Sequence, residues 1–209
     1  MITISTRPYS RRNRHFLQHF QILKEGGENR LVLRDINNTA FQHVVHWLYT
    51  GRFSPTIYDS PSIIIKTYAV ADRLMMTRCK NMAMDSLRNK FSHSRADISH
   101  LVTTRDLGYS ASHIIASYII EQTTFEAIAN PSRHLEGFTE ELFLEGSDLA
   151  AEFVRKLVEK ARPSMPKYDS GVVIHNKIHN DPALQLGCVY HEHAEGEKCY
   201  LLDPLDATG

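Results

Sequence analysis

The chain has few cysteines, no excess charge of either sign and no long hydrophobic run. Only 3 of its 209 residues are cysteine, and an odd number at such wide spacing does not form the disulfide framework of a secreted protein. The 24 basic side chains balance 24 acidic ones, which argues against attraction to nucleic acid or to an anionic membrane. No apolar run approaches the roughly 20 residues of a membrane span, and no signal peptide is recognisable. We therefore expect an intracellular protein, nuclear or cytoplasmic, with no membrane contact and no direct nucleic-acid partner.

Signatures of catalysis are also missing from the sequence. Gly26 and Gly27 form a turn that lacks the spaced glycines and the Lys-Ser/Thr pair of a nucleotide-binding loop. No nucleophile stands in a recognisable motif with a positioned base, and Cys79 lies on an apolar helix face, which is typical of a small core residue. We therefore predict that the protein is not an enzyme.

What the sequence does contain is apolar residues at helical spacing. One stripe falls at i, i+3, i+4 and i+7 and consists of Phe41, Val44, Val45 and Leu48. Asn38 or Thr39 is the expected N-cap of this helix, and Gly51 is expected to end it in the left-handed conformation. An apolar share of 42% is enough to bury a core around it.

Further stripes predict helices along most of the remaining chain. Residues 64–91 fit a helical hairpin, and residues 96–103, capped by Ser94, fit a short helix. Residues 110–129 and 147–162 complete the series, each ended by a proline.

Short extended segments are predicted between these helices. Leu31 and Leu33 alternate with Val32 and Arg34, so residues 29–35 fit a strand with one buried face. Residues 1–6 and 171–181 also look extended, and Phe53 is placed at the start of a short strand. The expected fold is therefore α+β and mostly α, a helical cluster with a short sheet.

Two motifs, spaced as in a known family, carry a resemblance to it. The first, LRDINNTAFQHVVHWLYTGRF, is similar to a strand, an acidic turn and an F…WLYTGRL helix, and the second is similar to a Y.lAdkl…lkn.A hairpin. The hairpin residues are Tyr68, Ala69, Ala71, Asp72, Leu74, Lys80 and Ala83. Together they resemble a BTB (POZ) domain of the fungal type over roughly residues 11–91. Only SRRNRHFLQHF resembles the family's opening segment, so we expect an N-terminal part that is truncated or diverged.

The resemblance implies a domain organisation and a class of function. It implies a BTB/POZ-like domain over residues 1–93. This domain is followed by a helical extension over residues 94–168 and a Cys/His-containing tail over residues 169–209. BTB domains are protein-protein interaction modules rather than enzymes. The implied partners are proteins: a second copy of the chain in a homodimer weakened by the incomplete start, transcription-related partners, or a cullin-type ubiquitin ligase scaffold for which the chain acts as substrate adaptor.

Two pairs of residues are candidates for partner binding. Leu23 and Glu25 stand where cullin-binding members carry an apolar-x-Glu element, although the end of a helix stripe beside a solvated Glu gives the same pattern. Trp47 lies at the margin of its apolar stripe, close to Tyr49, and either packs under the hairpin that follows or contacts a partner.

The tail concentrates residues with metal-ligating side chains. Cys188, His191, His193 and Cys199 place two thiols and two imidazoles within 12 residues, a ligand set suited to tetrahedral zinc. The two histidines would share one face of a strand, and the spacing lacks the C-x2-C or H-x3-H pairs of common zinc modules. The alternatives are a small hairpin with surface histidines and no cofactor, or a small zinc-binding module or metal-dependent enzyme centred on these four residues.

Overall fold

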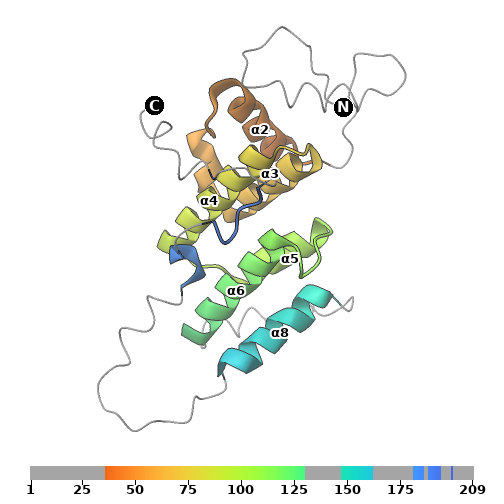
Figure 1. Ribbon diagram of the computed structural model, residues 1–209, viewed down its shortest axis with the longest axis vertical. Coiled ribbons are helices and arrows are strands. Elements are labelled where there is room, and N and C mark those ends of the chain that lie inside the picture. Colours follow the sequence, from red (N-terminus) through yellow and green to blue (C-terminus); the bar gives the residue numbers. More distant parts are fainter. Residues whose placement is uncertain (1–35, 130–146, 162–180, 186–187, 194–198, 200–209) are drawn as a thin grey trace. The chain divides into compact units, whose positions relative to one another are not determined.

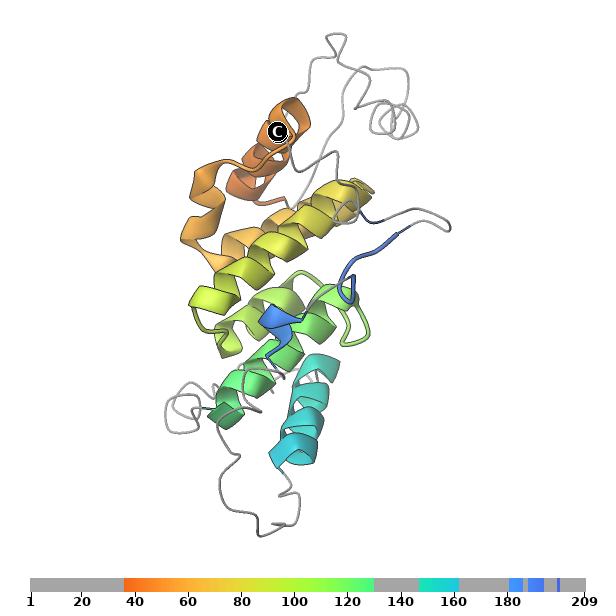
Figure 2. The same ribbon diagram turned by 60° about the vertical axis from the view of Figure 1, so that its left-hand side comes forward.

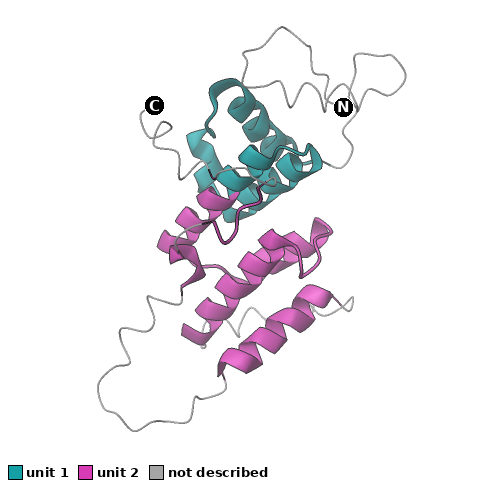
Figure 3. Ribbon diagram, in the orientation of Figure 1, with its two compact units in different colours: residues 1–83 teal, residues 84–209 magenta. Residues whose placement is uncertain are grey.

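The described residues of the computed structural model are 36–129, 147–161, 181–185, 188–193 and 199 (Figure 1). Their regular structure consists of six α-helices and two 3-10 helices. The chain divides into two compact units, residues 1–83 and 84–209, with the boundary inside α4 (Thr77–His93) (Figure 3). No helix within the described ranges is long and apolar enough to cross a membrane.

The predicted short sheet, and with it the α+β class, is wrong for the described residues, which form helices and no strand. Phe53 does not begin a strand but is buried just before η2 (Pro55–Asp59). Pro55 has no amide hydrogen for a strand ladder and is well suited to the first turn of a helix. Residues 188–193 form a turn rather than a strand. The segments 1–6, 29–35 and 171–180, also predicted to be extended, lie outside the described residues.

Helix α2 (Asn38–Thr50) of the first unit has a signal at each end. The Asn37 side chain accepts a hydrogen bond from the Ala40 amide at 3.0 Å, so the N-cap lies one residue before Asn38, the first of the two predicted positions. Gly51 ends the helix with a φ of 73°, and its amide donates to the Trp47 carbonyl. The predicted C-terminus of this helix is therefore confirmed.

Helix α3 (Pro61–Arg73) packs against α2 and supplies much of the first unit's core. Pro61 is the first residue of the helix, a position that does not need an amide hydrogen. The fully buried side chains of this core include Val44, Ile57, Ile64, Ile65 and Cys79. The first unit is thus a set of helices whose apolar faces meet.

The half-buried Trp47 ties α2 to α4 within the first unit. Its indole Nε1 donates a hydrogen bond to the sulfur of Met82, with 3.0 Å between the two atoms. Lys80 and Asp72 form a second cross-link, an ion pair with 2.8 Å between Nζ and Oδ1. Trp47 therefore packs under the hairpin, the first of the two roles considered for it.

Helix α6 (Ile114–Ala129) is the centre of the second unit. It packs against α5 (Ile98–Asp106), α8 (Asp148–Ala161) and η5 (Pro182–Leu184). Two views of the structure show α8 alongside α6 (Figures 1 and 2). Because neighbours cover α6 on several sides, most of its residues are buried, polar ones included.

The start of α5 differs from the predicted one. Its N-cap is Asp97, not Ser94: the Asp97 carboxylate accepts from the Ser99 amide, and the Asp97 amide donates to Nδ1 of His100. This reciprocal arrangement is a capping box with histidine in place of the usual Glu or Gln, which explains why the sequence pattern did not reveal it.

Trp47→Ala should lower the free energy of unfolding by about 2 kcal/mol, less than a fully buried tryptophan costs, because the ring is only half-buried. Trp47→Phe keeps most of the ring contacts and should cost about 1 kcal/mol or less. Urea denaturation followed by circular dichroism measures both. A Trp47→Ala variant within about 0.5 kcal/mol of wild type would contradict the cross-linking role.

Candidate metal centre

The structure brings together only some of the residues singled out in the sequence. Leu23 and Glu25 lie outside the described residues. Tyr49, near the C-terminus of α2, is 58% exposed, whereas Trp47 is turned toward Met82. The Cys/His residues of the tail are the set that the fold assembles into one cluster.

Four potential metal ligands converge in the second unit. They are Cys188, His191, His193 and Cys199, and their ligand atoms all lie within 4.8 Å of one another. A tetrahedral zinc ion with two sulfur and two nitrogen ligands holds neighbouring ligand atoms about 3.3 to 3.8 Å apart, given zinc–sulfur and zinc–nitrogen bonds of about 2.3 and 2.0 Å. The cluster therefore needs only small side-chain movements to surround an ion.

A turn, rather than the strand expected from the sequence, places the first two ligands. The His191 amide donates a hydrogen bond to the Cys188 carbonyl at 3.1 Å, which closes a four-residue turn. Cysteine and histidine at the two ends of this turn face the same cluster. The spacing Cys-x2-His thus acts geometrically like the two-residue knuckles of zinc modules.

His191 is oriented by contacts at both ring nitrogens. Its side chain is fully buried, with Nδ1 lying 3.3 Å from the Cys199 sulfur and Nε2 lying 2.7 Å from Oδ1 of Asp85. Because Nε2 is bonded to the Asp85 carboxylate, Nδ1 is the ring nitrogen that faces the Cys199 sulfur. A carboxylate behind a histidine is the usual arrangement in protein metal sites.

The pKa of His191 reflects these contacts. Burial lowers it, but the hydrogen bonds to Asp85 and Cys199 outweigh burial, and the net pKa is raised. The hydrogen bond that the Cys188 thiol donates to Cys199 is the main cause that raises the pKa of Cys188, followed by burial. Two neighbouring thiols of this kind lose their protons readily only when a cation neutralises both thiolates.

His193 offers a buried ring nitrogen to the cluster. Its Nε2 is buried and has no hydrogen-bond partner among the described residues. Buried polar atoms in folded proteins are nearly always paired, and a bound ion is one explanation for an exception. The unpaired nitrogen belongs to the same four-residue cluster.

The roles of Asp85 and Arg88 were not predicted from the sequence. Arg88 is buried; its guanidinium lies 3.7 Å from the Asp85 carboxylate and donates a hydrogen bond to the carbonyl of Gln185. The only signal in the sequence was their i, i+3 spacing, which also fits an exposed ion pair. Their contacts hold the tail segment beside the last turns of α4.

The remaining cysteine offers no second site. Cys79 is fully buried, and burial raises its pKa well above the usual value, so it stays a protonated thiol. None of the three cysteines forms a disulfide bond among the described residues. Cys79 therefore fits the predicted role of a small core residue.

Neither a family model, nor a curated protein, nor a solved structure matches the chain. The BTB resemblance and the functions that it implies therefore stay predictions.

Asp85→Ala should weaken zinc binding by the full chain about 10- to 100-fold, because His191 loses the acceptor that fixes its ring orientation. Asp85→Asn keeps an acceptor oxygen without the charge, and its zinc affinity should lie between those of Asp85→Ala and wild type. Competition titration against a chromophoric chelator measures the affinity. Asp106→Asn, which changes an exposed carboxylate on α5, is the matched control. Equal affinities for Asp85→Ala and wild type would show that Asp85 does not support the metal.

Proposed function

We propose that the protein is a non-catalytic binding module whose second unit is stabilised by a structural zinc ion. The observation that carries this proposal is the convergence of the ligand atoms of Cys188, His191, His193 and Cys199 within 4.8 Å. Two thiolates and two imidazoles are a preferred ligand set for zinc, whereas magnesium and calcium prefer oxygen. The carboxylate behind His191 and the unpaired Nε2 of His193 support the same assignment.

The number of ligands favours a structural role over catalysis. Catalytic zinc sites usually have three protein ligands and leave the fourth position to water or substrate, whereas structural sites have four. Here four protein side chains are available within one cluster. An ion held by all four would have no open position, so the alternative of a metal-dependent enzyme is disfavoured.

The position of the ligands explains what the ion would stabilise. Cys188 and Cys199 are 11 positions apart in the tail, and His191 contacts Asp85 of α4. A zinc ion would close the tail on itself and strengthen its attachment to the helix. In small metal sites of this kind, the free energy of binding contributes to the stability of the fold.

A second proposal concerns the first unit: it binds protein partners as an adaptor of the BTB type. The supporting observation is Tyr49, a large aromatic side chain that is 58% exposed near the end of the helix that carries the resemblance. Tyrosine is enriched among the residues that dominate binding energy at protein interfaces. The expected cullin contact at Leu23 and Glu25, homodimerisation and transcription-related partners remain predictions of the same resemblance.

The zinc proposal predicts about one zinc ion per chain in protein purified without chelator, and less than about a tenth of an ion in the Cys188→Ser, Cys199→Ser double variant. Chelation should lower the unfolding temperature of wild type but not that of the double variant. Elemental analysis and calorimetry measure the two quantities. Cys79→Ala, which removes a thiol outside the cluster, should keep the full zinc content. Wild-type protein without zinc that also fails to take up added zinc would refute the proposal.

For the adaptor proposal, Tyr49→Ser should weaken binding to a purified cullin-type scaffold about tenfold or more, because an interface tyrosine loses its buried ring. Tyr58→Ser, which changes another exposed tyrosine of the first unit, is the control and should bind like wild type. Calorimetric titration gives both affinities. Equal losses in the two variants, or a wild-type chain that does not bind the scaffold, would contradict the proposal.

A further inference from the structure

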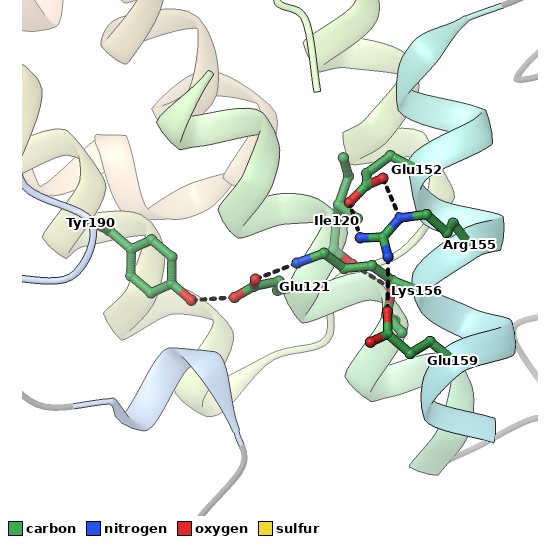
Figure 4. A network of polar contacts seen from close by, with 8 residues as sticks. Ile120, Glu121, Glu152, Arg155, Lys156, Glu159 and Tyr190 are labelled. Atoms are coloured by element: carbon green, nitrogen blue, oxygen red, sulfur yellow. Dashed lines mark hydrogen bonds and ion pairs between the residues drawn. The ribbon is translucent and has the colours of Figure 1, made fainter. Parts of the chain in front are cut away.

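A row of polar contacts leads from the metal-ligand turn to α8. Tyr190 lies between the ligands Cys188 and His191, and its hydroxyl donates to Oε2 of Glu121 on α6 at 2.7 Å. The other carboxylate oxygen, Oε1, accepts from Nζ of Lys156 on α8 at 2.5 Å. Figure 4 shows Glu121 placed between the two partners. One carboxylate thus joins the tail to α8.

The ring of Tyr190 is held firmly in this position. It is only 4% exposed, and its centroid lies 4.8 Å from that of Tyr118 in an edge-to-face arrangement. The guanidinium of Arg88 lies 5.7 Å from the same ring. Because Arg88 also contacts Asp85, which is hydrogen-bonded to His191, Tyr190 is connected to the metal centre through side chains as well as through the backbone.

The protonation states suit the contacts. Burial raises the pKa of Tyr190, and the hydrogen bond to Glu121 raises it further, so the hydroxyl keeps the proton that it donates. Burial raises the pKa of Glu121, but the hydrogen bonds from Lys156 and Tyr190 outweigh burial and the net pKa is lowered. Glu121 is therefore a carboxylate that accepts from both neighbours.

From these contacts we infer that metal occupancy and the docking of α8 on α6 are coupled through Tyr190, Glu121 and Lys156, so that loss of the ion loosens α8. The inference rests on the proposed zinc site. Two ligands flank Tyr190, so an ion that fixes them also fixes its hydroxyl against Glu121. Without the ion, the turn that carries Tyr190 loses a restraint, and its hydrogen bond to the half-buried Glu121–Lys156 pair weakens in surroundings of limited solvation, where such networks are strongly coupled.

Coupling of this kind gives the metal site a regulatory effect. Leu149 and Phe153 are fully buried side chains of α8, and α8 packs against α6. If zinc is removed, the equilibrium shifts toward a state in which α8 separates from α6 more often and these side chains reach solvent. Zinc availability would thereby set how often this apolar face is exposed.

The structure offers a matched control on the same helix. Arg155 pairs with Glu152 and Glu159, both on α8, and its side chain is 59% exposed (Figure 4). Arg155→Met removes these ion pairs without touching the contacts of Glu121. It therefore tests whether loss of any charged pair on α8 has the same effect as loss of the Glu121–Lys156 contact.

Hydrogen exchange of the full chain, followed by mass spectrometry of peptides covering residues 148–161, tests the coupling. In wild type, chelation should accelerate amide exchange in α8 about tenfold, the effect of losing a hydrogen bond to a charged group. Tyr190→Phe removes one oxygen and should reduce this acceleration to about threefold or less while retaining one zinc per chain. Arg155→Met should keep the wild-type response.

A second measurement uses the reciprocity of coupled equilibria. Lys156→Met lies outside the ligand set, yet it should weaken zinc affinity about three- to tenfold, whereas Arg155→Met should leave that affinity unchanged. The coupling would be overturned, and the zinc site left intact, if the protein binds zinc but chelation does not change amide exchange in α8. Equal zinc affinities for Lys156→Met and wild type would have the same meaning. A wild-type chain that binds no zinc would overturn both.

Discussion

The hydrogen bond between His191 and Asp85 is the constraint on which the described tail depends. It joins residues 106 positions apart and fixes which imidazole nitrogen faces the two thiols. Without it, the buried ring of His191 would keep a donor with no acceptor, a costly arrangement in a protein interior. The turn at Cys188, the placement of Tyr190 and the contacts of Arg88 all lie within a few residues of this bond.

Polar contacts help to specify how the helices of the second unit pack. Helix α6 is buried against α5, α8 and η5. Apolar contacts alone would allow it to shift along these neighbours, because such contacts are not directional. Glu121 resolves this by accepting from one partner in the tail and one on α8. Networks that are fully satisfied favour one arrangement of the helices over others, because any shift leaves a buried group unpaired.

Local pattern predicted the helices but not the contacts between distant residues. The stripe around Phe41 and the stop at Gly51 were readable because helical periodicity and a left-handed cap are local properties. The strand at Phe53 was wrong, since Pro55 favours the first turn of a helix. The four Cys/His residues were found by composition, but Asp85, Arg88 and Glu121 were not, because an amphipathic pattern does not tell which charged residue is covered by a distant segment.

The central claim is a closed metal site with two sulfur and two nitrogen ligands. X-ray absorption at the zinc edge of the full chain tests it most directly, because it reports the ligand elements and their distances. We expect two sulfurs at about 2.3 Å and two nitrogens at about 2.0 Å. A zinc ion with no bound sulfur, or one bound by six oxygen atoms, would contradict the account.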